Sequence, residues 1–329
     1  YSTTITEKER DIQNLMFADS WLNTYLPFST MGTDILFSAS DLCAEDDRIF
    51  ALGMNLANEF SAYESIRKEV NKSLSLGSKL KVVSLGNNSP ASKAGILVND
   101  EILEIDGESL IQGKDAYKSY IEKINKDYQK LYELKVLRNG EFKNIKIRSE
   151  ERCRFNYFID LDNNTFNAFA NGEYMVFSLR MAKWLMQDEV GAAVVFAHEL
   201  GHNANKHVAD KMQNASTGAF LGLLLGIYIG LPQDMMEMGQ SIGANAYSIE
   251  YENEADYLSM YILAQSGYEL DEAVNFWRRF AVEVPNSIYS TGGTHPSTAE
   301  RYVRMESTIN EIKDKISKNE ELIPTYKQD

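Results

Sequence analysis

The segment His198-Glu-Leu-Gly-His202 has the residue types and spacing of a zinc site. The two histidines are four positions apart, so on a helix both imidazoles project from one face and can share a Zn²⁺ ion. Glu199 can take a proton from an attacking water and later give it to a leaving amine. Residues 187–211 lack proline and include an apolar packing face, which predicts a buried helix for this motif.

A catalytic zinc ion usually has three protein ligands, so this site needs one more. His207 is out of register for a third histidine ligand, and we interpret it as a helix-surface residue or a residue that supports a ligand. The segment Glu250-Tyr-Glu-Asn-Glu-Ala-Asp256 offers glutamates instead. Only Glu252 among them has a carboxylate four positions later, so Glu252 can bind zinc while Asp256 accepts the second N–H of a ligand histidine.

A third segment could bind substrate. In Thr165–Phe177, the pair Asn171-Gly172 is a strong signal for a two-residue turn. The strand through Asn167, Ala168 and Phe169 would then offer an edge on which a substrate chain can lie extended, with its carbonyl group at the zinc ion. A hairpin whose edge is covered is the alternative.

These segments together resemble a known family of zinc peptidases. H-E-x-x-H, the later E-x-x-A-D, the N-A-F-A hairpin and an H-P-x-x-x-x-R motif at 295–301 are similar to those of the gluzincin family of HtpX, BepA, LoiP, the mitochondrial Oma peptidase and the CAAX prenyl protease. The resemblance covers residues 155–304. It implies a peptidase domain that holds one Zn²⁺ ion per chain through His198, His202 and Glu252.

The motif at 295–301 adds two candidate catalytic residues. Pro296 favours a loop for His295, ahead of the helix that carries Arg301. His295 either donates a hydrogen bond to the developing oxyanion or, as the resemblance to BepA-like members suggests, occupies the fourth zinc position until substrate displaces it. Arg301 would stabilise the oxyanion or a substrate carboxylate, and an ordinary salt bridge is the alternative.

Upstream, residues 75–149 read as short strands and turns with one helix. Asn139-Gly140 between two strand-like runs predicts a hairpin. The predicted strands are 80–85, 101–105, 134–137 and 142–147, and the predicted helix is 114–126.

The part from Ser89 to Gly107 closely resembles the PDZ fold of bacterial proteases, although Asn99 stands where that family usually has glycine. PDZ domains bind peptides by adding a strand to a sheet edge, with backbone N–H groups receiving the terminal carboxylate. If this carries over, the loop with Leu76 and Gly77 receives the carboxylate, and the groove lies between the following strand and the 114–126 helix. A module that only braces the enzyme is the alternative.

The N-terminal residues are expected to be helical, most clearly 44–70, where apolar residues recur at three- and four-residue spacing. We predict an α+β protein: a mainly helical zincin-type metallopeptidase domain with a small β-hairpin sheet, and an inserted PDZ-like α+β module. The predicted parts are a helical region at 1–74 that packs on the peptidase, the PDZ-like domain at 75–149 and the metallopeptidase domain at 150–329.

Composition limits the remaining choices. With 329 residues and 44% hydrophobic content the chain can bury a large core, and its charge of -15 without a basic cluster excludes nucleic acid as a partner. Cys43 and Cys153 form a disulfide in an oxidising compartment or are buried thiols. Residues 218–231 carry no charge and are too short to span a bilayer; interior packing is favoured, and a membrane-contacting helix is the alternative.

The expected function is zinc-dependent hydrolysis of unfolded or mislocalised polypeptides, with peptide termini bound by the PDZ-like module. A self-inhibited chaperone or binding protein, with zinc held closed by His295, is the alternative. Because the chain begins at Tyr1, we expect a trimmed N-terminal segment and membrane association through an anchor on it. The family resemblance implies a bacterial cell envelope, with a periplasmic or lipid-anchored protein.

Overall fold

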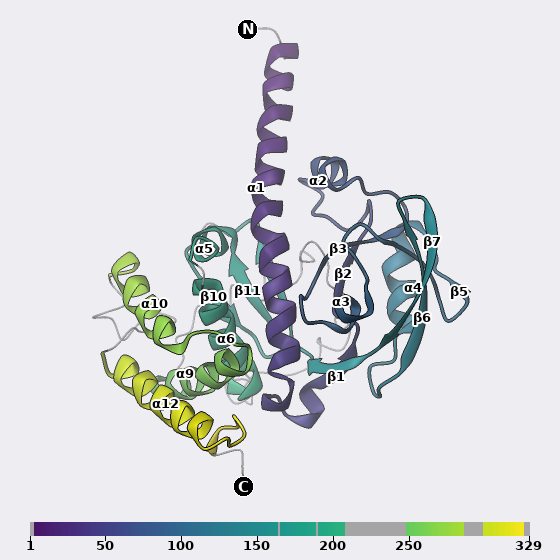
Figure 1. Cartoon of the computed structure of the whole chain (residues 1–329). Coiled ribbons are helices and arrows are strands. Elements are labelled where there is room, and N and C mark those ends of the chain that lie inside the picture. The colour runs from purple at the N-terminus through teal and green to yellow at the C-terminus, as the bar shows by residue number, and fades with distance from the viewer. Residues whose placement is uncertain (1–2, 164, 189, 208–247, 286–298, 326–329) are drawn as a thin grey trace, which may run out of the picture. The chain divides into compact units, whose positions relative to one another are not determined.

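The computed structural model describes residues 3–325 except 164, 189, 208–247 and 286–298. The described residues form two compact units (Figure 1). One contains the residues up to 34 together with 49–151. The other contains 35–48 and the described residues from 152 onwards.

An antiparallel sheet forms the centre of the first unit. The predicted strands at 80–85 and 101–105 are confirmed, and so is the hairpin, because Asn139 and Gly140 have positive φ angles of 51° and 82° that suit a two-residue turn. The strand order is β2 (Met54–Ala57), β3 (Leu80–Leu85), β4 (Glu101–Ile105), β6 (Leu131–Arg138) and β7 (Glu141–Arg148), and β5 (Glu108–Ser109) pairs with β4.

Short helices connect these strands. They are α2 (Arg67–Leu74), α3 (Pro90–Ala94) and α4 (Ala116–Lys123), the last preceded by the 3-10 turn η3 (Gly113–Asp115). The side chain of Ser89 caps α3 by accepting a hydrogen bond from the Ser92 N–H. Asn99 has a φ of 76°, the left-handed conformation that glycine adopts most easily. The core between sheet and α4 includes Leu56, Val82, Ile102, Tyr120 and Tyr132.

The prediction of a helix across 44–70 is wrong. This stretch contains η2 (Glu45–Asp47), β1 (Arg48–Ala51) and β2, and Gly53 turns the chain between the two strands with a φ of 77°. Leu52 and Leu56 lie four positions apart, a spacing that fits one face of a helix and equally one face of a strand. Both are buried in the core of the sheet. The PDZ-like sheet therefore begins before residue 75.

The long helix α1 (Thr3–Ser38) is helical as predicted, and its C-terminal part attaches to this sheet. The Asn55 side chain of β2 donates a hydrogen bond of 2.6 Å to the Ser29 hydroxyl. The Asp34 carboxylate accepts hydrogen bonds of 3.0 Å from the backbone N–H groups of Asn87 and Asn88. These contacts fix α1 to an edge strand and to the turn that precedes α3.

The second unit combines a small sheet with helices, which together with the first unit confirms the α+β class. Its strands lie in the order β10 (Ala168–Ala170), β11 (Tyr174–Ser178), β9 (Asn156–Asp160); β10 runs antiparallel and β9 parallel to β11. Its helices are η1 (Ser40–Leu42), α5 (Leu179–Leu185), α6 (Gly191–Ala204), α9 (Ile249–Gln265), α10 (Leu270–Glu283) and α12 (Ala299–Ser317). Within the described residues, no helix has the length and apolar character needed to cross a membrane.

The structure decides between the two alternatives for the cysteines, because Cys43 and Cys153 form a disulfide. Cys153 ends the strand β8 (Glu150–Cys153), which pairs with β1. Both cysteines are buried, and they are separated by 110 positions in the sequence. The covalent loop that they close contains every strand of the PDZ-like sheet.

Loss of this disulfide should destabilise the second unit. A closed loop of this length stabilises by at most about 4.7 kcal/mol, and by less when part of the loop stays folded on its own. We expect the double variant Cys43→Ser, Cys153→Ser to unfold at a lower urea concentration than the oxidised protein. Wild type kept under a reducing agent should match the variant. Equal unfolding midpoints for the oxidised protein and the variant would contradict this expectation.

Candidate active site

The two predicted histidine ligands lie on α6. This helix is buried along its whole length and packs on the small sheet, where the Phe196 ring stacks on Phe177 of β11. His198 and His202 are one helical turn apart, and neither is accessible to solvent. Their Nε2 atoms lie 3.2 Å apart, so both rings present a nitrogen to the same point.

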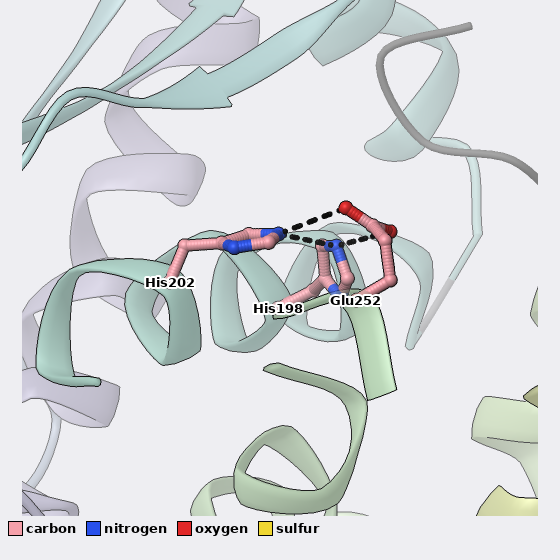
Figure 2. Close-up of side chains that lie close together, drawn as sticks. All are labelled: His198, His202 and Glu252. Carbon is pink, nitrogen blue, oxygen red and sulfur yellow. Dashed lines mark hydrogen bonds and ion pairs between the residues drawn. The ribbon is translucent and has the colours of Figure 1, made fainter. Parts of the chain in front are cut away.

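Glu252 completes the cluster from α9. The Ser248 hydroxyl caps this helix by accepting a hydrogen bond from the Tyr251 N–H. One carboxylate oxygen of Glu252 lies 3.2 Å from His202 Nε2, and the other lies 3.5 Å from His198 Nε2. The ligand atoms of the three residues lie within 4.8 Å of one another. Figure 2 shows the three side chains with their mutual contacts as dashed lines.

The cluster fits a zinc ion in its chemistry and its charge. Two imidazole nitrogens and one carboxylate are a ligand set of catalytic zinc sites. The carboxylates of Glu199, Glu252 and Asp256 are buried, and the buried guanidinium of Arg301 lies 3.1 Å from Glu252 and 2.6 Å from Asp256. A divalent cation would balance the two negative charges that remain among these four groups, and buried charges need such pairing.

Gly201 lets α6 and α9 approach closely enough to form this cluster. A Cβ atom at Gly201 would lie 2.8 Å from the carbonyl oxygen of Ala255 and 3.2 Å from its Cα atom. Gly201 directly precedes His202, and Ala255 directly precedes Asp256, so this contact sets the spacing between ligands from the two helices. Gly201 was not among the residues predicted for the site, although a glycine inside the motif was the available signal.

Asp256 lies beside the first ligand histidine. One of its carboxylate oxygens is 2.9 Å from His198 Nδ1, which leaves Nε2 of that ring for a metal ion. Arg301 of α12 donates hydrogen bonds of 2.6 and 2.7 Å to the two oxygens of Asp256 and lies 3.1 Å from Glu252. The guanidinium thus makes the salt bridges that the sequence left open as the alternative role of Arg301, and its contact with an oxyanion or a substrate carboxylate stays a prediction.

The two carboxylates change the acidity of His198. Burial alone lowers the pKa of an imidazole, but the hydrogen bonds and charges of Asp256 and Glu252 outweigh it and raise the pKa of His198 to about 10. At neutral pH the metal-free site therefore holds a proton on His198. A metal ion has to displace that proton, because only the neutral imidazole is a ligand.

His207 lies against the second ligand histidine. Its Nδ1 atom is 3.0 Å from His202 Nδ1, and its Nε2 atom is 3.0 Å from a carboxylate oxygen of Glu254. The His207 ring is buried and stacks on Tyr251, with 4.5 Å between ring centroids. Burial lowers the pKa of His207. His207 is therefore not a helix-surface residue; it contacts the predicted ligand His202, which is the other interpretation left open from the sequence.

Glu199 and the predicted substrate strand also belong to this region. Glu199 is 1% exposed on α6, next to His198. Ala168 and Phe169 lie in β10, a terminal strand of its sheet, and α6 packs against that strand. The carbonyl of Asn167 accepts a hydrogen bond of 3.0 Å from the Ser178 N–H.

Asn203, which was not predicted from the sequence, connects α6 to this hairpin. Its side-chain oxygen accepts a hydrogen bond of 2.7 Å from the Gly172 N–H, and its amide nitrogen donates one of 3.3 Å to the Tyr174 carbonyl. The turn between β10 and β11 is therefore held by the residue that follows His202. A buried asparagine directly after the motif gave no distinct sequence signal.

The predicted peptide groove of the PDZ-like module is wrong. The N–H of Leu76 donates to the Asn71 carbonyl at 2.9 Å, and the carbonyl of Gly77 accepts from the Glu59 N–H at 2.9 Å. The strand that follows them, β3, already pairs with β2 and β4, so no further strand can be added to it. In this part of the structure, β2 and β7 are the terminal strands of the sheet.

Two sequence predictions fall outside the described residues. One is the role of His295, and the other is the packing of the glycine-rich segment 218–231.

Comparison with known proteins defines the class of protein. Residues 135–309 match the model of peptidase family M48, and residues 51–148 match that of the PDZ domain. The chain belongs to peptidase family M48, a family of metallopeptidases, and carries a PDZ domain. This agrees with the family resemblance and with a metal cofactor held by the cluster.

Curated relatives include the mitochondrial metalloendopeptidase OMA1 of Saccharomyces cerevisiae, 26% identical over 159 residues, which are 44% of this chain and 45% of that protein. The Arabidopsis thaliana OMA1 is 28% identical over 137 residues, 41% of this chain and 28% of that protein. The chain thus spans less than half the length of these relatives. The expected bacterial cell-envelope location is contradicted, because these relatives are mitochondrial proteins of eukaryotes.

Solved structures match about a third of the chain. The HtrA-type protease AlgW with a decapeptide is 25% identical with a TM-score of 0.25, and the match covers 32% of this chain and 30% of that one. The HtrA3 PDZ domain bound to a phage-derived ligand is 19% identical with a TM-score of 0.24, over 32% of this chain and 88% of that one.

The contact between α6 and α9 predicts that Gly201→Ala disrupts metal binding. The added methyl group would meet the Ala255 backbone, which cannot move aside as a side chain can, and overpacking of this kind costs about 1–3 kcal/mol. We expect weaker zinc binding and a lower melting temperature. Gly77→Ala is the matched control, because a Cβ atom there would meet nothing within 4 Å. Wild-type zinc affinity in Gly201→Ala would refute the role of this contact.

Proposed function

We propose that the protein is a zinc-dependent endopeptidase that cleaves unfolded or mislocalised polypeptides as part of protein quality control. The observation that carries the proposal is the buried cluster of His198, His202 and Glu252, whose ligand atoms lie within 4.8 Å of one another. Glu199, which is also buried, follows His198 on α6. Membership in peptidase family M48 supports it.

Each residue of the site has a distinct task in this reaction. A zinc ion bound by the cluster would polarise the peptide carbonyl and make water a nucleophile at neutral pH. Glu199 takes the proton of the attacking water and delivers it to the leaving amine. Asp256 holds the His198 ring in one tautomer, and Arg301 keeps Asp256 in place and limits the repulsion between Asp256 and Glu252.

Substrate would lie extended along β10. This strand is terminal in its sheet and packs next to α6, and Asn203 ties its turn to the end of the zinc motif. Addition of a strand reads backbone groups rather than particular side chains. Such recognition favours unfolded chains of many sequences over one specific protein.

Casein digestion with zinc analysis tests this mechanism. We expect Glu199→Gln to lose about 100- to 10,000-fold in activity while keeping one zinc ion per chain, since it removes only the proton acceptor. Glu252→Ala should lose the zinc ion. Glu250→Ala is the matched control on the same helix, because Glu250 is exposed and lies outside the cluster.

Two outcomes would decide against this proposal. Casein cleavage by Glu199→Gln at the wild-type rate would exclude Glu199 as the base. Activity that appears only in His295→Ala would favour the alternative of a self-inhibited chaperone or binding protein.

For the PDZ domain we propose bounds of 49–151 and binding of peptide termini along β2. This strand is terminal in the sheet, and its Leu56 shares a core with Tyr120 of α4, so a peptide added to β2 would run beside that helix. The match of residues 51–148 to the PDZ domain supports this assignment.

Peptides with modified ends test this binding. With Glu199→Gln as an uncleaving host, we expect labelled peptides with a free C-terminal carboxylate to bind at least tenfold more tightly than amidated copies, because backbone N–H groups receive the charge. Acetylated and free N-termini should bind alike. Equal binding of carboxylate and amide peptides would exclude terminal recognition.

A further inference from the structure

We propose that His207 and Glu254 position the metal ligand His202, as a hydrogen-bonded chain that fixes the tautomer and the orientation of its ring. The chain runs from His202 Nδ1 to His207 Nδ1 over 3.0 Å, and from His207 Nε2 to the Glu254 carboxylate over 3.0 Å. The inference rests on the proposed function, because it takes His202 as a metal ligand.

When a metal ion is bound to His202, only one distribution of protons satisfies both hydrogen bonds that link His202, His207 and Glu254. A metal ion on His202 Nε2 requires the neutral ring to carry its proton on Nδ1. That N–H then donates to Nδ1 of His207, which must accept. His207 therefore carries its own proton on Nε2 and donates it to Glu254, an acceptor in its carboxylate form. Each group fixes the state of the next, and Nε2 of His202 carries no proton, as a metal ligand must.

The position of His207 is set by the local backbone and by contacts away from the metal. Lys206 has a φ of 59°, a strained value for a residue other than glycine, and it turns the chain back at the end of α6. The Lys206 ammonium lies 3.2 Å from Asp46 and 3.7 Å from Asp47, which holds this turn. Tyr251 stacks on the His207 ring, with 4.5 Å between the ring centroids.

The two ligand histidines are supported in different ways. His198 contacts Asp256, whose side chain is 3% exposed and is held by Arg301. His202 contacts a neutral ring, and the charge at the end of its chain belongs to Glu254, whose side chain is 57% exposed. Loss of the His207 side chain should therefore weaken zinc binding more than loss of the Glu254 side chain, because the exposed charge of Glu254 is screened by solvent.

Zinc affinity, measured by competition with a chromophoric chelator, tests the proposal. We expect His207→Ala to bind zinc about 10- to 100-fold more weakly, as removal of the partner of a ligand histidine usually does. His207→Gln should recover most of this loss, because its amide oxygen can accept from His202 and its amide nitrogen can donate to Glu254. Glu254→Ala should weaken binding by less than about tenfold. Glu250→Ala, an exposed glutamate one turn earlier on α9, should bind as the wild type does.

A second readout separates positioning from folding. In the cobalt-substituted protein we expect the visible absorption bands to shift in His207→Ala and to return towards wild type in His207→Gln, with urea midpoints measured in parallel. Wild-type zinc affinity and an unchanged cobalt spectrum in both His207→Ala and Glu254→Ala would overturn the proposal. So would equal losses in His207→Ala and His207→Gln at unchanged urea midpoints. If the wild type itself takes up no zinc ion, the proposed function fails first.

Discussion

The close contact between α6 and α9 is the constraint on which the site depends. The absence of a side chain at Gly201 lets the Ala255 backbone come near enough for carboxylates of one helix to meet histidines of the other. The same contact buries Glu252, Asp256 and Glu199 together, which is unfavourable for three like charges. Arg301 offsets one charge and a bound divalent cation would offset the rest, so folding and metal binding are coupled here.

Helix α6 combines several tasks that follow from this arrangement. It supplies both histidine ligands and the proposed base Glu199, and through Asn203 it fixes the turn of the hairpin whose strand β10 would receive substrate. The reacting carbonyl and the metal would thus be positioned by one rigid element, which limits errors in their relative placement. Supports on the far sides of the ligands, Asp256 for one and His207 for the other, keep their rings in place.

The PDZ domain lies within a stretch of the chain that the disulfide closes into a loop. The chain passes from the second unit into residues 49–151 after residue 48 and returns to the second unit at residue 152, and the first 34 residues group with 49–151. Cys43 and Cys153 join the segments just outside those two points, so the domain forms a closed covalent loop. Its sheet uses β2 and β7 as terminal strands, and the pairing order rather than the loop sequence decides which edge a peptide can reach.

Short sequence patterns were sufficient to predict features that depend on residues close together in the chain. The four-residue separation of His198 and His202 places both on one helical face, the Asn139-Gly140 pair specifies a hairpin, and the Ser89 cap begins a helix. Glu252 could be selected because Asp256 follows it by one helical turn.

Tertiary structure decided what depends on partners distant in the sequence. Leu52 and Leu56 suit a helix or a strand equally. Only the pairing of β2 with β3 made Leu56 part of a sheet, and Leu52 packs in the core of that sheet. His207 supports the site because it contacts His202, and Arg301 of α12 supports it because it binds Asp256 of α9. Neither contact can be read from spacing within one helix. The sequence by itself determined which residues could bind a metal ion, because His198 and His202, and likewise Glu252 and Asp256, lie four positions apart, about one helical turn. Which groups support them was decided by packing, because burial and hydrogen bonding are properties of the assembled core.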